Sequence, residues 1–329
     1  MRLIITYFNI NLIRKWKDAI LYLKSEKDNQ ELFINLTKTQ SILNEKIFRI
    51  YIKDDLLLFQ KEEGSSIYTY NEKYIKKFLN KECFISKRPI NQFIISEKEK
   101  NGYTYFLLNE SLELTKIPFS PNFIYKNFII DHWNREVIKN YNFKDQKLLW
   151  EKDISTYGKN KTLNSEQIIP NEIDGQLLGF EDSIYVPLQG GQLLCLDIYT
   201  GEKKWIQDYN GRSGFYSLQN DKIYKHDGLS LLEIDVKTGV ILRSKIFSAN
   251  NESELQNFYA LNTFWTYDDV IILYGLDNRV ILLNRQTFDL SDSVNLQTGI
   301  STDENNVIWH ENKLYILDLN NTLHVFEKD

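Results

Sequence analysis

The stretch LLCLDIYTGEKKW, residues 193–205, decides the fold of this chain. A run of apolar residues leads to Asp197, the pair Thr200 and Gly201 follows, and a second short segment closes on Trp205. Asp, Thr and Gly suit a tight turn, because the short side chains bond the local backbone and Gly accepts a positive φ. The stretch therefore predicts two antiparallel strands joined by a turn. If it recurs along the chain, it defines the whole architecture.

It does recur. The stretch LEIDVKTGVIL places Asp235 before Thr238 and Gly239 with the same spacing. More degraded copies are anchored by an amide residue, or by a phenylalanine in the last unit, at Asn35, Asn71, Asn109, Asn142, Asn284 and Phe326. A turn-forming residue lies 14 to 18 positions before each anchor, at Asp18, Asp55, Asn91, Asn127, Asp182, Asp221, Asp269 and Asn312. Each unit of about forty residues is expected to be a four-stranded antiparallel meander, which is the period of propeller blades.

Composition supports an all-β chain. Aromatic residues make up 14% of the 329 residues, with 20 Tyr and 19 Phe, while Met occurs once. Aromatic and β-branched residues favour pleated, half-buried surfaces, and no long stretch has a helical period. We expect a single β-propeller domain over residues 1–329.

The quoted stretch resembles the repeat of the quinoprotein-like, or PQQ-like, β-propellers. That repeat has an Ala-Leu-Asp, Thr-Gly-Lys, Trp pattern, and its Trp docks between neighbouring blades. Recognisable letters remain in the units ending near Trp150, Trp205 and Arg243. The resemblance implies the propeller fold and a diverged, non-catalytic branch. The quinoprotein dehydrogenases that share the fold use longer chains, adjacent cysteines and a calcium site, none of which is seen in this sequence.

The two ends of the chain fit each other. The last unit stops after its third strand, while RLIITYFN at the front belongs to no unit. An N-terminal strand that completes the C-terminal blade would remove exposed sheet edges. We therefore expect eight blades closed by this exchange. Seven is the alternative, because the first unit is the weakest match to the repeat.

Charge and cysteine content exclude several classes. The 40 Lys and Arg against 45 Asp and Glu give a net charge of −5, spread without the basic stripe of a nucleic-acid binder. Cys83 and Cys195 are far apart, so neither a disulfide framework nor a zinc site is indicated. No run is long enough for a membrane helix, and the N-terminal segment lacks the features of a signal peptide. We expect a cytoplasmic protein, and the Lys-, Asn- and Ile-rich usage suggests an AT-rich bacterial genome.

Catalysis has little support in the sequence. The four histidines fall on different expected strands: His132 and His226 on second strands, His310 on a first and His324 on a third. No nucleophile elbow, phosphate loop or metal-ligand spacing occurs. We expect no enzyme activity, no cofactor and no metal. Trp150 and Trp205 are expected to pack between blades, and Cys195 to lie in the core.

Two connections between units are longer than the rest, at about residues 152–175 and 247–265. Both join the outer strand of one blade to the inner strand of the next, so they should emerge on one face. Long loops on a rigid scaffold often carry binding, although drifted insertions are an equal alternative. The predicted partner-binding residues are Tyr157, Lys159, Lys161, Glu252, Glu254, Phe258, Tyr259 and Trp265.

Two classes of function follow. The first is a non-catalytic protein-binding or scaffold propeller that uses the loop-rich face, with an immunity-type protein as one specific form. The second is an enzyme or small-molecule binder that uses the central channel. The expected partner of the first class is another protein, not nucleic acid, and no membrane insertion is expected.

Overall fold

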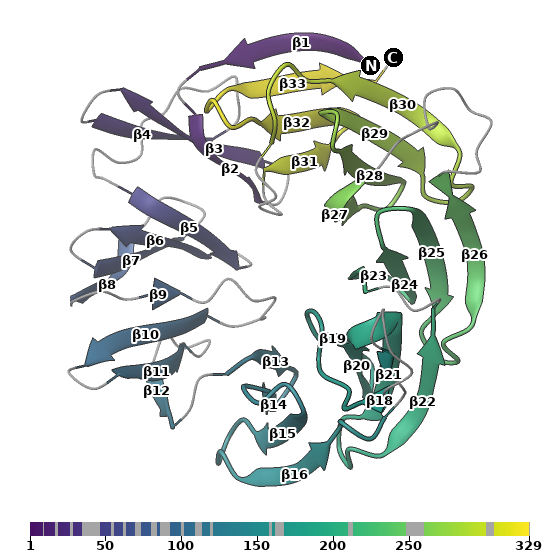
Figure 1. Ribbon diagram of the computed structural model, residues 1–329. Coiled ribbons are helices and arrows are strands. Elements are labelled where there is room, and N and C mark those ends of the chain that lie inside the picture. The colour runs from purple at the N-terminus through teal and green to yellow at the C-terminus, as the bar shows by residue number, and fades with distance from the viewer. Residues whose placement is uncertain are drawn as a thin grey trace. The chain divides into compact units, whose positions relative to one another are not determined.

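A computed structural model describes most of the chain (Figure 1). The backbone is described for residues 1–329 except 9, 17–18, 27–28, 35–46, 54–55, 62–63, 70–73, 80–83, 86–92, 100–101, 109–113, 119–120, 158–159, 162–167, 210–212, 248–259, 301–305 and 329. Side chains are described outside these positions and outside 16–19, 25–102, 107–113, 158–169 and 260–263.

The chain divides into two compact units. Unit 1 comprises Met1 and residues 127–304, and unit 2 comprises residues 2–126 and 305–329. A single domain over 1–329 stays a prediction.

Unit 1 is built from consecutive antiparallel sheets, each with its strands in chain order (Figure 1). The first sheet is β13 (Phe123–Tyr125), which precedes the unit boundary, with β14 (Phe128–Asp131), β15 (Val137–Asn142) and β16 (Leu148–Asp153). The second is β19 (Leu178–Phe180), β20 (Ser183–Leu188), β21 (Gln192–Asp197) and β22 (Lys203–Asp208), with a 3-10 turn η1 (Gln189–Gly191) between β20 and β21. The third is β23 (Phe215–Gln219), β24 (Lys222–His226), β25 (Ser230–Asp235) and β26 (Ile241–Ile246). The fourth is β27 (Ala260–Thr266), β28 (Val270–Gly275), β29 (Arg279–Asn284) and β30 (Leu290–Asn295). A small hairpin, β17 (Asn160–Lys161) with β18 (Ile168–Ile169), lies in the first long connection.

Unit 2 repeats the pattern. Its sheets are β2 (Ile10–Trp16), β3 (Ala19–Glu26) and β4 (Asn29–Ile34); β5 (Ile47–Lys53), β6 (Leu56–Lys61), β7 (Gly64–Thr69) and β8 (Tyr74–Leu79); β9 (Phe84–Ile85), β10 (Phe93–Glu99), β11 (Gly102–Leu108) and β12 (Leu114–Ile117); and β1 (Arg2–Tyr7) with β31 (Val307–His310), β32 (Lys313–Leu317) and β33 (Leu323–Glu327). The described residues thus form seven four-stranded sheets and one three-stranded sheet of blade topology. Eight blades would require this number of sheets, and the blade count itself stays a prediction.

The N-terminal strand completes the C-terminal sheet, as expected. β1 runs antiparallel to β33, with Arg2 opposite Glu327 and Tyr7 opposite Leu323. Buried apolar side chains of this sheet pack against those of β2 and β3. The backbone N of Ile10 also donates to Asn321 O at 2.8 Å. The N-terminal segment therefore supplies the fourth strand that the last unit lacks.

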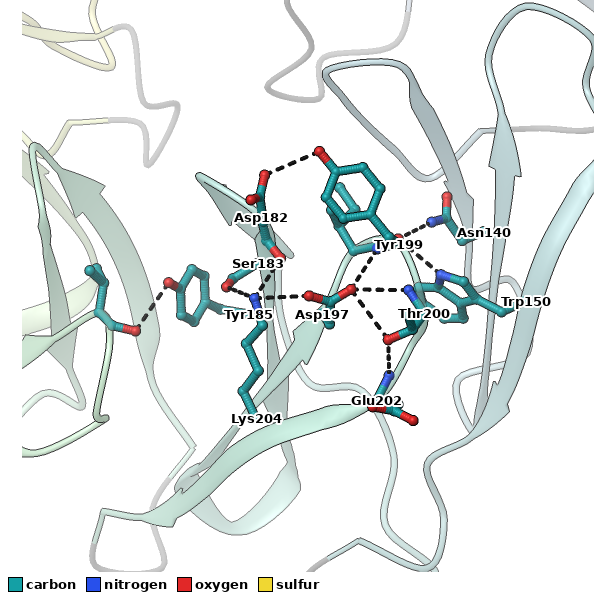
Figure 2. Close-up of polar contacts among 12 residues, drawn as sticks. Asn140, Trp150, Asp182, Ser183, Tyr185, Asp197, Tyr199, Thr200, Glu202 and Lys204 are labelled. Atoms are coloured by element: carbon teal, nitrogen blue, oxygen red, sulfur yellow. Dashed lines mark hydrogen bonds and ion pairs between the residues drawn. The ribbon is translucent and has the colours of Figure 1, made fainter.

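The recurring acidic residue organises its turn, as Figure 2 shows. Asp197 Oδ1 accepts hydrogen bonds from the backbone N of Tyr199 at 2.9 Å and of Thr200 at 3.0 Å. Gly201 follows at φ +70°, a conformation that favours glycine. Desolvation opposes ionisation of Asp197, but bonds from Lys204 and from the turn outweigh it and lower the pKa of this carboxyl. Asp235 makes the same bonds to Lys237 N and Thr238 N, and hence the motif is a structural turn.

Side chains of the neighbouring sheet pack on the same turn and bond its backbone (Figure 2). Trp150 Nε1 in β16 donates to Ile198 O at 2.9 Å, and Asn140 Nδ2 donates to the same oxygen at 2.7 Å. A Cβ on Gly201 would lie 2.7 Å from the Trp150 ring, so the indole covers the glycine directly. Trp205 covers Gly239 in the same way, with 2.8 Å to the corresponding position. The expected packing role of both tryptophans is confirmed.

The third junction uses a different pair of side chains at the same two positions. Arg243 replaces the tryptophan, and Phe288 replaces the glycine at φ +65°. The Arg243 guanidinium lies 3.9 Å from the centroid of the Phe288 ring, bonds Glu233, and donates to Arg285 O at 2.8 Å. Arg285 follows the turn anchor Asn284, as Ile198 follows Asp197. The acceptor carbonyl therefore has the same position in both turns, while the side chain that covers the turn differs.

Deleting residues 2–9 should strip β33 of its outer strand. Because the β1–β33 hydrogen bonds would be lost and an apolar sheet edge exposed, we expect the melting temperature to fall by roughly 5–10 °C. Circular dichroism melting of the deleted and full-length chains measures this. An unchanged melting curve would contradict the exchange.

Gly201→Phe should destabilise the chain by about 3 kcal/mol or more, because the new ring would overlap Trp150. Transplanting the third junction, by adding Trp150→Arg and Asn140→Glu, should recover part of that loss. Denaturant unfolding of both variants is the measurement. Gly190→Ala, at φ +73° in another turn, controls for backbone strain alone, and equal unfolding of the single and triple variants would sink the idea.

Candidate functional site

Both long connections start on one face of unit 1, at Ile154 and Phe247, and we call it the long-loop face. It consists of the loops between second and third strands and the segments that leave the fourth strands. The ends of the fourth strands bond these loops in all four sheets: Ile154 N to Glu136 O at 2.8 Å, Tyr209 N to Gly191 O at 3.2 Å, Phe247 N to Leu229 O at 2.9 Å and Leu296 N to Asn278 O at 3.1 Å. The expectation that both connections start on one face agrees with these bonds.

The second half of the first long connection is fixed between two sheets. Asn171 is fully buried, and its Nδ2 donates to Tyr157 O and to Gln192 Oε1, both at 2.8 Å. Ile173 exchanges bonds with Arg135 of the first sheet, while Glu172 O accepts from Gln189 N of the second at 2.9 Å. Asn171 and Ile173 therefore anchor this part of the connection between the two sheets.

The predicted site residues separate into three groups. Tyr157 is half-buried, with its ring 5.8 Å from Lys152 Nζ and 5.7 Å from Lys203 Nζ, so it also holds two outer strands together. Lys161 lies in β17, opposite Ile168. Trp265 lies in β27 and is only 6% exposed, so its side chain is a core element, and we leave it out of the binding surface. The remaining five lie outside the described residues: Lys159, Glu252, Glu254, Phe258 and Tyr259.

A residue that the sequence reasoning passed over is the most prominent on this face. Trp133, in the loop between β14 and β15, is 80% exposed. Its loop is nonetheless rigidly held: Trp133 N donates to Asp131 Oδ1 at 3.0 Å, Glu136 N to Asn134 Oδ1 at 3.0 Å, and Arg135 Nη2 to Ile173 O at 2.6 Å. The signal in the sequence was a tryptophan within HWNRE, a polar run between two strands.

The histidines lie on the expected strands, except that His132 directly follows its strand, and His324 Nε2 lies 3.0 Å from Asp318 Oδ2. His226 is fully buried between Phe247 and Phe264, with centroid distances of 6.0 and 5.7 Å, and neither ring nitrogen has a hydrogen-bond partner. Burial lowers the pKa of His226 to about 4, so the ring is neutral at pH 7. Cys195 is buried as expected, and burial raises the pKa of its thiol to about 11. Such a thiol is inert.

Neither a metal centre nor a membrane helix is found in the described ranges. No group of three or more His, Cys, Asp or Glu side chains in this part of the chain is arranged to hold a metal ion. Across the same residues, no helix has the length and apolarity needed to traverse a bilayer.

Solved structures share the fold. No family model and no curated protein matches the sequence. BamB from Moraxella catarrhalis aligns at a TM-score of 0.58 with 13% identity, covering 99% of this chain and 97% of that one. Sqt1 from Saccharomyces cerevisiae gives 0.62 and 9% with complete coverage of both chains, and the C-terminal WD40 domain of Sif2 gives 0.57 and 11%, covering 100% and 96%. These likenesses, with the antiparallel sheets, show an all-β propeller.

His226 should make stability depend on pH. Its pKa is lower in the folded chain than the unperturbed value near 6.5, so the unfolded chain binds more protons in between. Stability should therefore fall as pH drops from about 6.5 toward 4, by on the order of 2–3 kcal/mol from this residue. Urea unfolding at pH 7.5 and 4.5 should show a smaller loss for His226→Leu than for the unaltered chain. Equal losses would contradict this role.

Proposed function

We propose that this protein is a non-catalytic, protein-binding β-propeller of the cytoplasm that captures its partner on the long-loop face. The observation that carries the proposal is Trp133, an aromatic side chain 80% exposed on a loop that hydrogen bonds hold in place. Exposed tryptophan is rare on a surface that has no partner, and tryptophan is enriched among residues that dominate binding energy. A fixed loop adds to affinity, since little conformational entropy is lost on binding.

The chemistry of the described interior supports a binding role over catalysis. His226 is sealed between two phenylalanines, and Cys195 is protonated and buried. Catalytic groups are more often found in accessible sites with a partner that activates them. An immunity-type protein, which blocks a toxin by binding it, is one form that this proposal includes.

The test is to redesign both long connections without touching the packed residues 170–177. Because Lys161 pairs with Ile168, replacing residues 162–167 by Asn-Gly would close the hairpin with a two-residue turn. Residues 248–259 would be exchanged for a Gly, Ser and Asn sequence of equal length, and Trp133 would be exchanged for alanine in the same variant. We expect an unchanged melting temperature, since loop sequence and length cost little, and loss of the partner in affinity capture from the native host.

The matched control redesigns the opposite face, by exchanging the turn residues Glu202 and Lys237 for serine. These are exposed and lie on the turns after β21 and β25. This variant should retain the captured protein. If the folded long-loop variant still captures the partner and the control variant does not, the binding site lies on the opposite face.

A further inference from the structure

The long-loop face of unit 1 is acidic. Its described residues, at 131–136, 153–157, 170–177, 189–191, 208–209, 213–214, 227–229, 247, 276–279 and 295–300, contain eight carboxylates and two arginines. The carboxylates are Asp131, Glu136, Asp153, Glu172, Asp174, Asp208, Asp227 and Asp277. The Asp227 carboxylate is buried and lies 3.8 Å from Lys225 Nζ, so it adds no net charge to the surface. The described part of this face therefore carries a net negative charge.

Both described arginines of the face are already neutralised by it. Arg135 lies 3.5 Å from Glu172 and 3.7 Å from Asp174, and Arg279 bonds Asp277 at 2.5 Å. The turns of the opposite face differ, because ten acidic residues there are interspersed with seven Lys and Arg. The potential of unit 1 is thus uneven, with the more negative side on the long-loop face.

Trp133 belongs to the same loop as Arg135, which pairs with two of these carboxylates. Arg135, two residues further along the same loop, contacts Ile173 O, Glu172 and Asp174, which brings the carboxylates of the first long connection to the tryptophan loop. A protein segment bound there would meet an exposed indole and, beside it, carboxylates that are about one third exposed. Indole faces attract Lys and Arg side chains, and carboxylates bind the same cations.

We infer that the partner of this face presents a basic segment that contains apolar residues, with its apolar or cationic side chains on Trp133 and its other cations on Glu172 and Asp174. This inference rests on the proposed function and names the chemistry of the partner. An acidic segment would be repelled by the carboxylates, and a purely apolar one would desolvate two carboxylates that share the single cation of Arg135. Association with a basic segment would be steered by charge and would weaken with salt.

The test uses defined probes with the full chain. The basic probe is a fluorescein-labelled peptide of three copies of Gly-Lys-Leu-Ser-Lys. One comparison peptide has Glu in place of Lys, and another has Ser in place of Leu. Fluorescence anisotropy should show saturable binding of the basic probe alone among the three, and its affinity should fall by about tenfold between roughly 50 and 300 mM salt.

Three variants locate the site. Trp133→Ala should weaken binding of the basic probe by about tenfold or more, and Trp133→Phe should restore most of it, since an aromatic face remains. Glu172→Gln with Asp174→Asn should weaken binding several-fold and flatten the salt dependence, since two carboxylate charges are removed while an amide oxygen at residue 172 can still accept from Gln189. The matched control, Glu181→Gln with Asp221→Asn, removes the same charge from the opposite face and should bind as the unaltered chain does.

Each outcome decides the inference. The inference is overturned if the Glu peptide binds as tightly as the basic probe. It is also overturned if Trp133→Ala and the Glu172 and Asp174 variant both keep their melting temperature and both bind the basic probe with unchanged affinity. If the basic probe does not bind while the long-loop redesign abolishes capture of the native partner, the proposed function stands and the basic character of the partner is wrong. If instead the redesigned chain still captures its partner, the proposed function itself fails.

Discussion

The packing of neighbouring sheets in unit 1 depends at three junctions on one backbone carbonyl, the one that follows the turn anchor after the third strand. At the first junction this is Ile198 O, which accepts from both Trp150 and Asn140. At the second, Val236 O accepts from Tyr185 OH at 3.1 Å, and at the third Arg285 O accepts from Arg243. A buried carbonyl must find a donor, so each sheet must offer its neighbour a suitable side chain. The anchor residue keeps the turn in a shape that presents this oxygen.

The covering side chain and the position it covers change together. Trp150 and Trp205 require glycine beneath them, because a Cβ would lie within 2.8 Å of either ring. Arg243 is thinner and planar, and it stacks on a phenylalanine at the position that glycine holds elsewhere. Tryptophan over glycine and arginine over phenylalanine thus both fill the junction, as the close packing of protein interiors requires. This exchange explains why the repeat becomes hard to recognise after Arg243 while the sheets continue unchanged.

Docking through the turns occupies one face of unit 1 with structural contacts and leaves the other available. The Asp and Thr-Gly positions, Lys204 and Tyr199 are engaged in bonds within or between sheets (Figure 2). On the long-loop face the connections vary in length, and the loop between β14 and β15 exposes Trp133. We therefore expect the binding residues to lie in loops whose sequence is not constrained by packing between sheets, since folds commonly carry their functional sites on such loops.

The sequence by itself determined the repeat, the strand order within each sheet, the completion of the last sheet by the first strand and the packing of Trp150 and Trp205. These follow from local patterns, because alternation sets strands and the Asp, Thr and Gly spacing sets turns. It did not determine which aromatic residues are exposed. Trp265 looked like a binding residue but is 6% exposed in a strand, whereas Trp133 was passed over and is 80% exposed. Exposure depends on which neighbouring sheet covers a residue, and only the tertiary structure brings together Arg135, Glu172 and Asp174 from loops almost forty residues apart in the chain.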